Sequence, residues 1–211
     1  MVNKVVEEII GKDYAGILIS DCYGAYNILE KAIKQKCLAH FSRDNHELLE
    51  IESVHVKNFY EELKFILQMA IQIHKDYKEG KATKEDLQKT KIELSEELAK
   101  LLSNQIENHE AEKLRKRMNK HFNEIFTFLE HPEIEPTNNR AERQLRPNVI
   151  MRKITFGNRS PQGAKNHCTI TSLSETAKLH GYSPFEIFYE VIIGKKEKLE
   201  KLLEATKPQP P

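Results

Sequence analysis

Two acidic residues far apart in the chain have the settings that metal-dependent phosphate chemistry requires. Asp21 follows the short apolar run 15–20, and Glu142 lies 121 residues further on, in a segment rich in arginine. Mg²⁺ prefers oxygen ligands and is commonly held by one or two carboxylates together with phosphate oxygens of a substrate. Arginine forks bind phosphate through two hydrogen bonds at once. The two acids therefore predict a site where a metal ion meets a phosphate group.

Each carboxylate also has a purely structural interpretation. Asp21 stands where it could cap a helix that follows the apolar run. Glu142 lies three residues after Asn139, which is the spacing of a capping box, and four residues before Arg146, which is the spacing of a helical ion pair. Three arginines on one short helix repel one another unless an anion is bound, so composition supports function and structure about equally for Glu142.

The positive charge of the chain is concentrated in one segment. The whole chain has a net charge of +1, whereas residues 136–170 contain seven Arg or Lys residues and one acid, a net charge of +6. Such a block in a near-neutral protein indicates a polyanionic partner, and a solvated charged face is the structural alternative. The candidate phosphate-binding residues are Arg140, Arg143, Arg146, Arg152, Lys153 and Arg159.

A further pair of candidate ligands is Cys37-x-x-His40. A structural zinc site has four ligands, and the sequence contains no second close pair to complete one. Cys22 and His46 could join only if the fold brought them there. The sequence therefore does not favour a zinc site, and simple packing of Cys37 is the structural alternative.

The elements that must position these residues begin with a small sheet. Residues 15–21 are predicted to form a buried strand that ends on Asp21, residues 25–34 a short helix, and residues 36–41 a second strand. A strand–helix–strand passage predicts a parallel pair. Ligands of α/β sheets bind at the carboxyl ends of the strands, which is where Asp21 would lie.

The centre of the chain, residues 45–131, is predicted to be almost wholly helical. Apolar residues recur there at helical spacing in three stretches. Gly80 ends the first helix, and Thr83-x-x-Asp86 has the pattern of an N-cap with an acid at N3 that opens the second. We interpret the apolar stripes as the core of a helical hairpin and a third helix, not as a partner surface.

The C-terminal part is predicted to contain three helices. The first spans about residues 139–146 and is stopped by Pro147, and residues 149–158 are extended or loop-like. Ser160-Pro161 and Ser183-Pro184 each place an N-cap residue before a proline at N1, so a helix begins at each.

The helix from Ser160 ends at Gly181, because glycine favours the left-handed conformation that follows a helix. Residues 207–211 are expected to be disordered.

Two regions of the sequence carry ordered motifs. The later one reads Pro136-Thr137-Asn138-Asn139-Arg140-Ala141-Glu142-Arg143-x-Leu145-Arg146-Pro147, then Arg152-Lys153-x-x-Phe156-Gly157-Asn158-Arg159-Ser160, then Ser172-Leu173-x-Glu175-Thr176-Ala177. The earlier one reads Gly16-x-Leu18-x-Ser20-Asp21-x-Tyr23-x-Ala25-Tyr26-Asn27, then Cys37-Leu38-Ala39-His40-x-x-Arg43-Asp44. From about residue 11 to 193, the chain resembles the insertion sequence 66 family of bacterial transposases.

This resemblance implies a DDE-type transposase with a ribonuclease-H-like catalytic fold and a helical insertion before the last acid. Asp21 would be the second acid of the triad and Glu142 the third. A two-metal site of Mg²⁺ or Mn²⁺ would then drive DNA strand cleavage and joining by phosphoryl transfer. The basic residues would bind phosphates of DNA at transposon ends. The residues expected beside the metal ligands are His40, Arg43 and Asn139. A Cys-x-x-His after the second acid also occurs in several transposase groups, so the resemblance favours His40 as a neighbour of the metal site or a DNA contact over a zinc ligand.

The expected fold class is α/β and helix-dominated, a partial ribonuclease-H-like fold with an all-helical insertion. We expect a sheet segment over residues 1–44, the insertion over 45–135 and a catalytic-helix and basic segment over 136–206. Only 20 residues precede Asp21, and Asp13 is their sole aspartate. We therefore expect a truncated chain that lacks the first acid, an incomplete metal site, and no activity of this chain alone.

The alternative function is a non-catalytic DNA-binding remnant or regulator. Such a chain would share the basic segment, would need no metal, and would act by self-association or by association with a full-length transposase. A helical interaction protein without a nucleic-acid role is a third interpretation.

Composition also bounds the compartment. No apolar stretch approaches the roughly 20 residues that span a bilayer. The three cysteines are an odd number, which is typical of free thiols in a reducing compartment. The N-terminus has acids where a signal peptide needs a basic flank and an apolar block. We expect a bacterial cytoplasmic, nucleoid-associated protein with no membrane partner.

Overall fold

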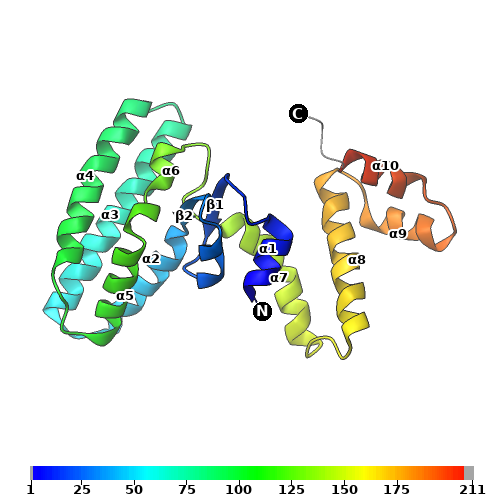
Figure 1. The fold of residues 1–211 in the computed structure, drawn as a ribbon, viewed down its shortest axis with the longest axis horizontal. Coiled ribbons are helices and arrows are strands. Elements are labelled where there is room, and N and C mark those ends of the chain that lie inside the picture. The colour runs from blue at the N-terminus through cyan, green and yellow to red at the C-terminus, as the bar shows by residue number, and fades with distance from the viewer. Residues whose placement is uncertain (1, 207–211) are drawn as a thin grey trace. The chain divides into compact units, whose positions relative to one another are not determined.

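A computed structural model describes residues 2–206 of the chain (Figure 1). The chain divides into two compact units, residues 1–142 and residues 143–211, and each has a hydrophobic core of its own. Helices make up most of both units, so the prediction of a helix-dominated fold is confirmed. The predicted disordered tail at 207–211 lies outside the described residues.

The first unit contains a parallel strand pair, as predicted, but its second strand lies earlier in the chain than predicted. Strand β1 (Ile17–Ser20) pairs with β2 (Ile33–Lys36) in the register Ile17 with Ile33 and Ser20 with Lys36. Asp21 directly follows β1, as predicted. Helix α1 (Val2–Ile10) and the short 3-10 helix η1 (Gly24–Ile28) pack together beside the sheet. Two strands do not identify a ribonuclease-H-like fold, so that assignment stays a prediction.

Two predicted elements near the sheet are wrong. The expected helix over 25–34 is only the short η1, because the chain must already be extended at Ile33 to pair with β1. The expected strand over 36–41 is instead the start of helix α2 (Leu38–His46), with Cys37 as its N-cap. The buried residues Leu38 and Phe41 are three apart, which is a helical period that a six-residue apolar run does not distinguish from a strand.

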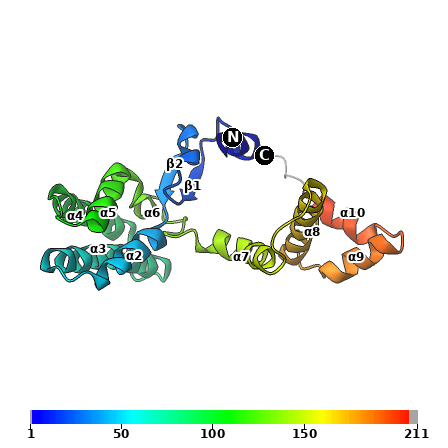
Figure 2. The ribbon, with the colours of Figure 1, turned by 90° about the horizontal axis from the view of Figure 1, so that it is seen from below.

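The helical centre is confirmed. Helices α3 (Val54–Lys78) and α4 (Lys84–Ser103) form the predicted hairpin, and α5 (His109–Lys120) packs against α4 and α2 (Figure 2). The 3-10 helices η2 (Glu47–Glu50) and η3 (Phe122–Glu124) and the short α6 (Thr127–Glu130) complete this part.

The helix boundaries of the hairpin follow the predicted local signals. Gly80 ends α3 with a φ of +73°, a conformation that side chains with a Cβ rarely adopt. Thr83 and Asp86 form the complete capping box at the start of α4. The stripes are core, as interpreted: Phe59, Leu63, Leu67, Leu87, Leu98, Leu114 and Met118 are all buried.

The sheet is tied to the helical centre through β2. The buried side chain of Gln35 donates to the backbone oxygen of Ile125 at 2.8 Å and accepts from the Phe128 amide at 2.9 Å. The hydroxyl of Thr127 donates to the Lys34 carbonyl at 2.7 Å. Because buried polar groups need partners, these bonds fix β2 against η3 and α6 and so fix the end of the sheet that carries Asp21.

The C-terminal part contains four helices. Helix α7 (Asn139–Ile154) starts in the first unit and continues into the second, and it is followed by α8 (Pro161–Leu179), α9 (Pro184–Ile192) and α10 (Glu197–Ala205). The predicted starts at Ser160-Pro161 and Ser183-Pro184 are confirmed, and so is the end of α8 before Gly181. Ala177, Ile187 and Leu202 form the small core of these helices.

The predicted stop of α7 at Pro147 is wrong. Of residues 149–158, predicted to be extended or loop-like, 149–154 are helical and 155–158 are a loop. Pro147 lies inside the helix, which runs on to Ile154. A proline removes one helical hydrogen bond and leaves one carbonyl without its donor. No described side chain of α7 is buried, so water reaches that carbonyl and the helix continues.

Candidate metal centre and phosphate-binding segment

Asp21 lies at the carboxyl end of β1, where a buried lysine fixes its backbone. Lys36 is 1% exposed, and its Nζ donates to the Ser20 hydroxyl and to the Asp21 carbonyl, both at 3.2 Å. The same Nζ lies 3.5 Å from a carboxylate oxygen of Glu124. A buried ammonium needs such a set of partners. Lys36 therefore holds the chain at Asp21 in place.

The Asp21 side chain itself forms a local turn. Its Oδ1 accepts the backbone N–H of Tyr23 at 3.0 Å, and its other oxygen accepts no hydrogen bond from a described residue. Cys22, between these two residues, is half-buried, and burial raises the pKa of its thiol against the opposing effect of the Arg117 guanidinium. Asp21 thus keeps one free carboxylate oxygen beside a neutral thiol.

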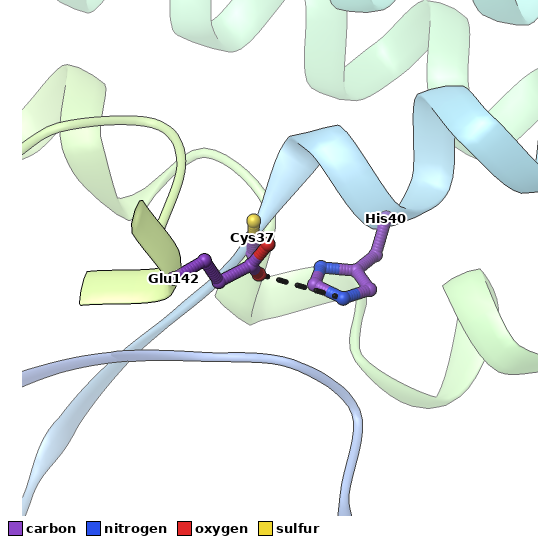
Figure 3. A group of neighbouring side chains, drawn as sticks. All are labelled: Cys37, His40 and Glu142. Atoms are coloured by element: carbon purple, nitrogen blue, oxygen red, sulfur yellow. Dashed lines mark ion pairs between the residues drawn. The ribbon is translucent and has the colours of Figure 1, made fainter. Parts of the chain in front are cut away.

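The structure brings Glu142 to Cys37 and His40, although about a hundred residues separate them in the sequence (Figure 3). One ligand atom of each residue lies within 4.8 Å of the other two, and among residues 2–206 this is the only group of three or more potential metal ligands. The His40 Nε2 lies 3.6 Å from the Glu142 Oε1. Asp21 is not part of this group.

The start of α2 and the chain before α7 are bonded to each other. The Leu38 amide donates to the Pro136 carbonyl at 3.0 Å, and the Asn138 amide donates to the Cys37 sulfur at 3.2 Å. These two contacts place the first turn of α7, with Glu142, over the first turn of α2, with His40. Cys37 at the N-cap and His40 three residues later lie on the same face of α2, because residues three or four apart in a helix share a face.

Neither structural interpretation of Glu142 is present. Within the described chain, no hydrogen bond joins its carboxylate to Asn139, and no ion pair joins it to Arg146. Asn139 is the first residue of α7 and is exposed, and Arg43 is exposed on α2. Among residues 2–206, His40 is the only basic side chain within 4.0 Å of the Glu142 carboxylate.

The predicted phosphate-binding residues are all exposed. Arg140, Arg143, Arg146, Arg152 and Lys153 lie on α7, and Arg159 lies in the loop before α8. In the part of the chain that the structure describes, none of the six forms an ion pair with a carboxylate, whereas many lysines of α3, α4 and α5 do. Unpaired cations that are free in water are available to an anionic partner.

Sequence reasoning missed an aromatic residue beside this segment. Phe156 is 96% exposed and has a φ of +57°, which is uncommon for a bulky residue. It lines an open groove of about 1070 Å³ between α7 and α8, together with Arg152 and Arg159. The signal available in the sequence was the Phe156-Gly157 pair between basic residues.

The fold and these residues define a helical protein with an exposed cationic helix whose first turn carries one of three potential metal ligands. The model of the family described as "Transposase IS66 family" matches residues 2–166. The chain belongs to this transposase family, as the sequence motifs indicated. Comparisons with curated proteins and with solved structures give no match.

Family membership sets the general context of the site. A transposase acts on DNA, and the family implies a divalent metal in general. Over residues 2–206, no helix has the length and apolar character needed to cross a membrane.

Proposed function

We propose that this chain takes part in DNA transposition as the portion of a DDE-type transposase that carries the second and third acids, Asp21 and Glu142. The observation that carries the proposal is the set of six exposed, unpaired cations that begins next to Glu142 on α7. These cations would hold phosphodiesters of DNA, and Glu142 in the same stretch of sequence is a carboxylate able to hold a metal.

The two carboxylates suit Mg²⁺ by their chemistry. Both side chains are partly exposed, one oxygen of Asp21 is free, and neither Glu142 oxygen accepts a hydrogen bond from a described residue. Hard oxygen donors with free lone pairs are what Mg²⁺ and Mn²⁺ select. When bound, such ions stabilise the attacking and leaving oxygens of a phosphoryl transfer.

The chain's own residues supply positioning. Lys36 fixes the backbone at Asp21, and the contacts of Cys37 and Leu38 with residues 136–138 fix the start of α7. The α7 cations bind phosphates without reading bases, so they contribute affinity and orientation.

Binding of Mn²⁺ and of DNA tests the proposal. Calorimetry should show that Asp21→Asn and Glu142→Gln each weaken Mn²⁺ binding, whereas Asp13→Asn, a matched aspartate in the turn after α1, leaves it unchanged. Fluorescence anisotropy of a labelled DNA duplex should show that affinity falls steeply as the salt concentration rises. Arg143→Ala should reduce the slope of log affinity against log salt concentration by about one, the value of one phosphate contact. Unchanged Mn²⁺ binding in both acid variants would exclude the metal assignment.

The alternative function is a DNA-binding chain without catalysis. One observation favours it: Asp21 does not join the ligand group around Glu142. Salt-dependent DNA binding that is lost in Arg143→Ala and unaffected by Glu142→Gln, without Mn²⁺ binding, would support this alternative.

A further inference from the structure

The ligand group at the start of α7 differs in chemical type from the pair of acids proposed above. It contains one sulfur, one imidazole nitrogen and one carboxylate, from Cys37, His40 and Glu142. Thiolate is a soft ligand and imidazole a borderline one, and Mg²⁺ selects neither. A mixed set of sulfur, nitrogen and oxygen donors is typical of Zn²⁺ and of its spectroscopic substitute Co²⁺.

The spacing of the three donors suits a tetrahedral ion. Two donors bonded at about 2.1 Å in a tetrahedral site lie roughly 3.4 Å apart. The observed separation of His40 Nε2 and Glu142 Oε1 is 3.6 Å, which is too long for a hydrogen bond and close to this tetrahedral edge. The third donor lies within 4.8 Å of both, so small side-chain rotations would close the set around an ion.

The sulfur of the cysteine is held in place by the backbone. Cys37 is 1% exposed, and its sulfur accepts the Asn138 amide at 3.2 Å. It is also the N-cap residue of α2, one turn before His40.

Neither ring nitrogen of the histidine has a hydrogen bond to a described residue. The Nε2 of His40 faces the Glu142 carboxylate at 3.6 Å, and its Nδ1 is buried without a hydrogen-bond partner. One imidazole gives one nitrogen to a single ion, so Nε2 is the nitrogen available to an ion beside Glu142. The Nδ1 needs a separate partner, as the second nitrogen of a metal-binding histidine usually does.

From these observations we infer that Cys37, His40 and Glu142 bind a zinc-class transition-metal ion, with a fourth position open to water. Three protein ligands and one open position are the pattern of an exchangeable site, and His40 and Glu142 are 30% and 41% exposed. The bound ion would clamp the first turn of α7 to α2. It would also compete with Mg²⁺ for Glu142. The inference needs neither DNA nor Asp21 and goes beyond the proposed function.

Co²⁺ titration of the full chain tests this site. The wild type should develop a thiolate-to-Co²⁺ charge-transfer band and the intense visible bands of tetrahedral Co²⁺, and Zn²⁺ should displace them. Cys37→Ser and His40→Ala should each weaken Co²⁺ binding by about 100-fold or more, because even residues that only support a ligand are worth 10–100-fold. The matched control is Cys168→Ser, which removes an exposed thiol outside the group.

A crossed comparison separates this site from the proposed Mg²⁺ site. Asp21→Asn should leave the Co²⁺ bands intact while weakening Mn²⁺ binding, and Cys37→Ser should do the reverse. Because Cys37 is buried, far-ultraviolet circular dichroism is used to check that the Cys37→Ser variant is folded. His40 is partly exposed, so His40→Ala provides an independent variant that is less prone to misfold. The absence of a charge-transfer band in the wild type, or its persistence in both Cys37→Ser and His40→Ala, would overturn the inference.

Discussion

The two units of this chain differ in how much of their apolar surface they bury. The first unit has an extended core of leucine and phenylalanine side chains from α2 to α6, whereas over residues 143–206 only Ala177, Ile187 and Leu202 are buried. On α7 and the loop after it, Leu145, Ile154 and Phe156 are each at least 60% exposed. Residues 143–206 therefore hold five of the six candidate phosphate-binding residues, all but Arg140, on or beside helices with few buried side chains.

The candidate metal ligands belong to the unit with the larger core, and most of the candidate phosphate-binding residues belong to the other unit. Asp21 and the Cys37–His40–Glu142 group lie on the well-packed unit, which can fix distances to fractions of an ångström. Phosphate contacts need less precision, because an exposed cation on a long side chain adjusts to its anion. Metal ligands need a rigid support. Cys37 and His40 have it at the start of the packed helix α2, whereas Glu142 lies on α7 and is held by the contacts of residues 136–138 with Cys37 and Leu38.

Core truncations should show the largest difference between the units. Leu98 is fully buried in α4, so Leu98→Ala should lower the free energy of unfolding by about 2–5 kcal/mol. Leu145 is 60% exposed, and Leu145→Ala should change it by less than about 0.5 kcal/mol. Urea denaturation measures both. Equal losses would show that α7 is packed as firmly as α4.

Replacing the internal proline should strengthen the weaker unit. Pro147→Ala restores a helical hydrogen bond and should stabilise α7 by about 3 kcal/mol, seen as slower amide hydrogen exchange between Asn148 and Ile154. Pro184→Ala is the control, because Pro184 is at the start of α9, where proline is tolerated. Unchanged exchange in α7 would mean that its helix is limited by tertiary contacts and not by the proline.

The exposed aromatic should affect DNA binding without affecting the fold. If Phe156 stacks on an unpaired base, Phe156→Ala should weaken single-stranded DNA binding by about 1–3 kcal/mol and leave the salt slope unchanged. Phe185→Ala removes another exposed aromatic, one that stacks on Tyr189, and serves as the control. Fluorescence titration measures the affinities. Equal losses in both variants would assign no specific role to Phe156.

Acid should weaken the first unit through one carboxylate. The Arg115 guanidinium and then the Ile106 amide, by hydrogen bonding, lower the pKa of Glu112 from 4.5 to about 2. A lowered pKa contributes stability that is present above pH 4.5 and is lost as the pH falls towards 2.

Urea denaturation between pH 7 and pH 3 measures this effect. Glu112→Gln should flatten the fall in the free energy of unfolding below pH 4.5. Glu96→Gln, which replaces an exposed glutamate of α4, should not change it. A fall of the same steepness in both variants would assign the acid sensitivity to other groups.

Elements with local signals were predicted from the sequence. The capping box of Thr83 and Asp86, the turn at Gly80 and the serine-proline starts of α8 and α9 involve residues within one helical turn, so the sequence contains the whole interaction. Failures occurred at residues 36–41 and at Pro147. There, strand pairing and solvent access decided between conformations that local preference leaves close in energy.

The sequence by itself determined the family, the helical centre, the cationic segment and the pairing of an acid with arginines, because each is a matter of residue type and near-neighbour spacing. Only the tertiary structure decided that Glu142 meets Cys37 and His40, since a contact across a hundred residues depends on how two chain segments pack. The structure likewise decided that Asp21 stands outside that group. Candidate metal ligands could be recognised from the sequence by residue type, whereas which of them come together depends on the packing of distant segments.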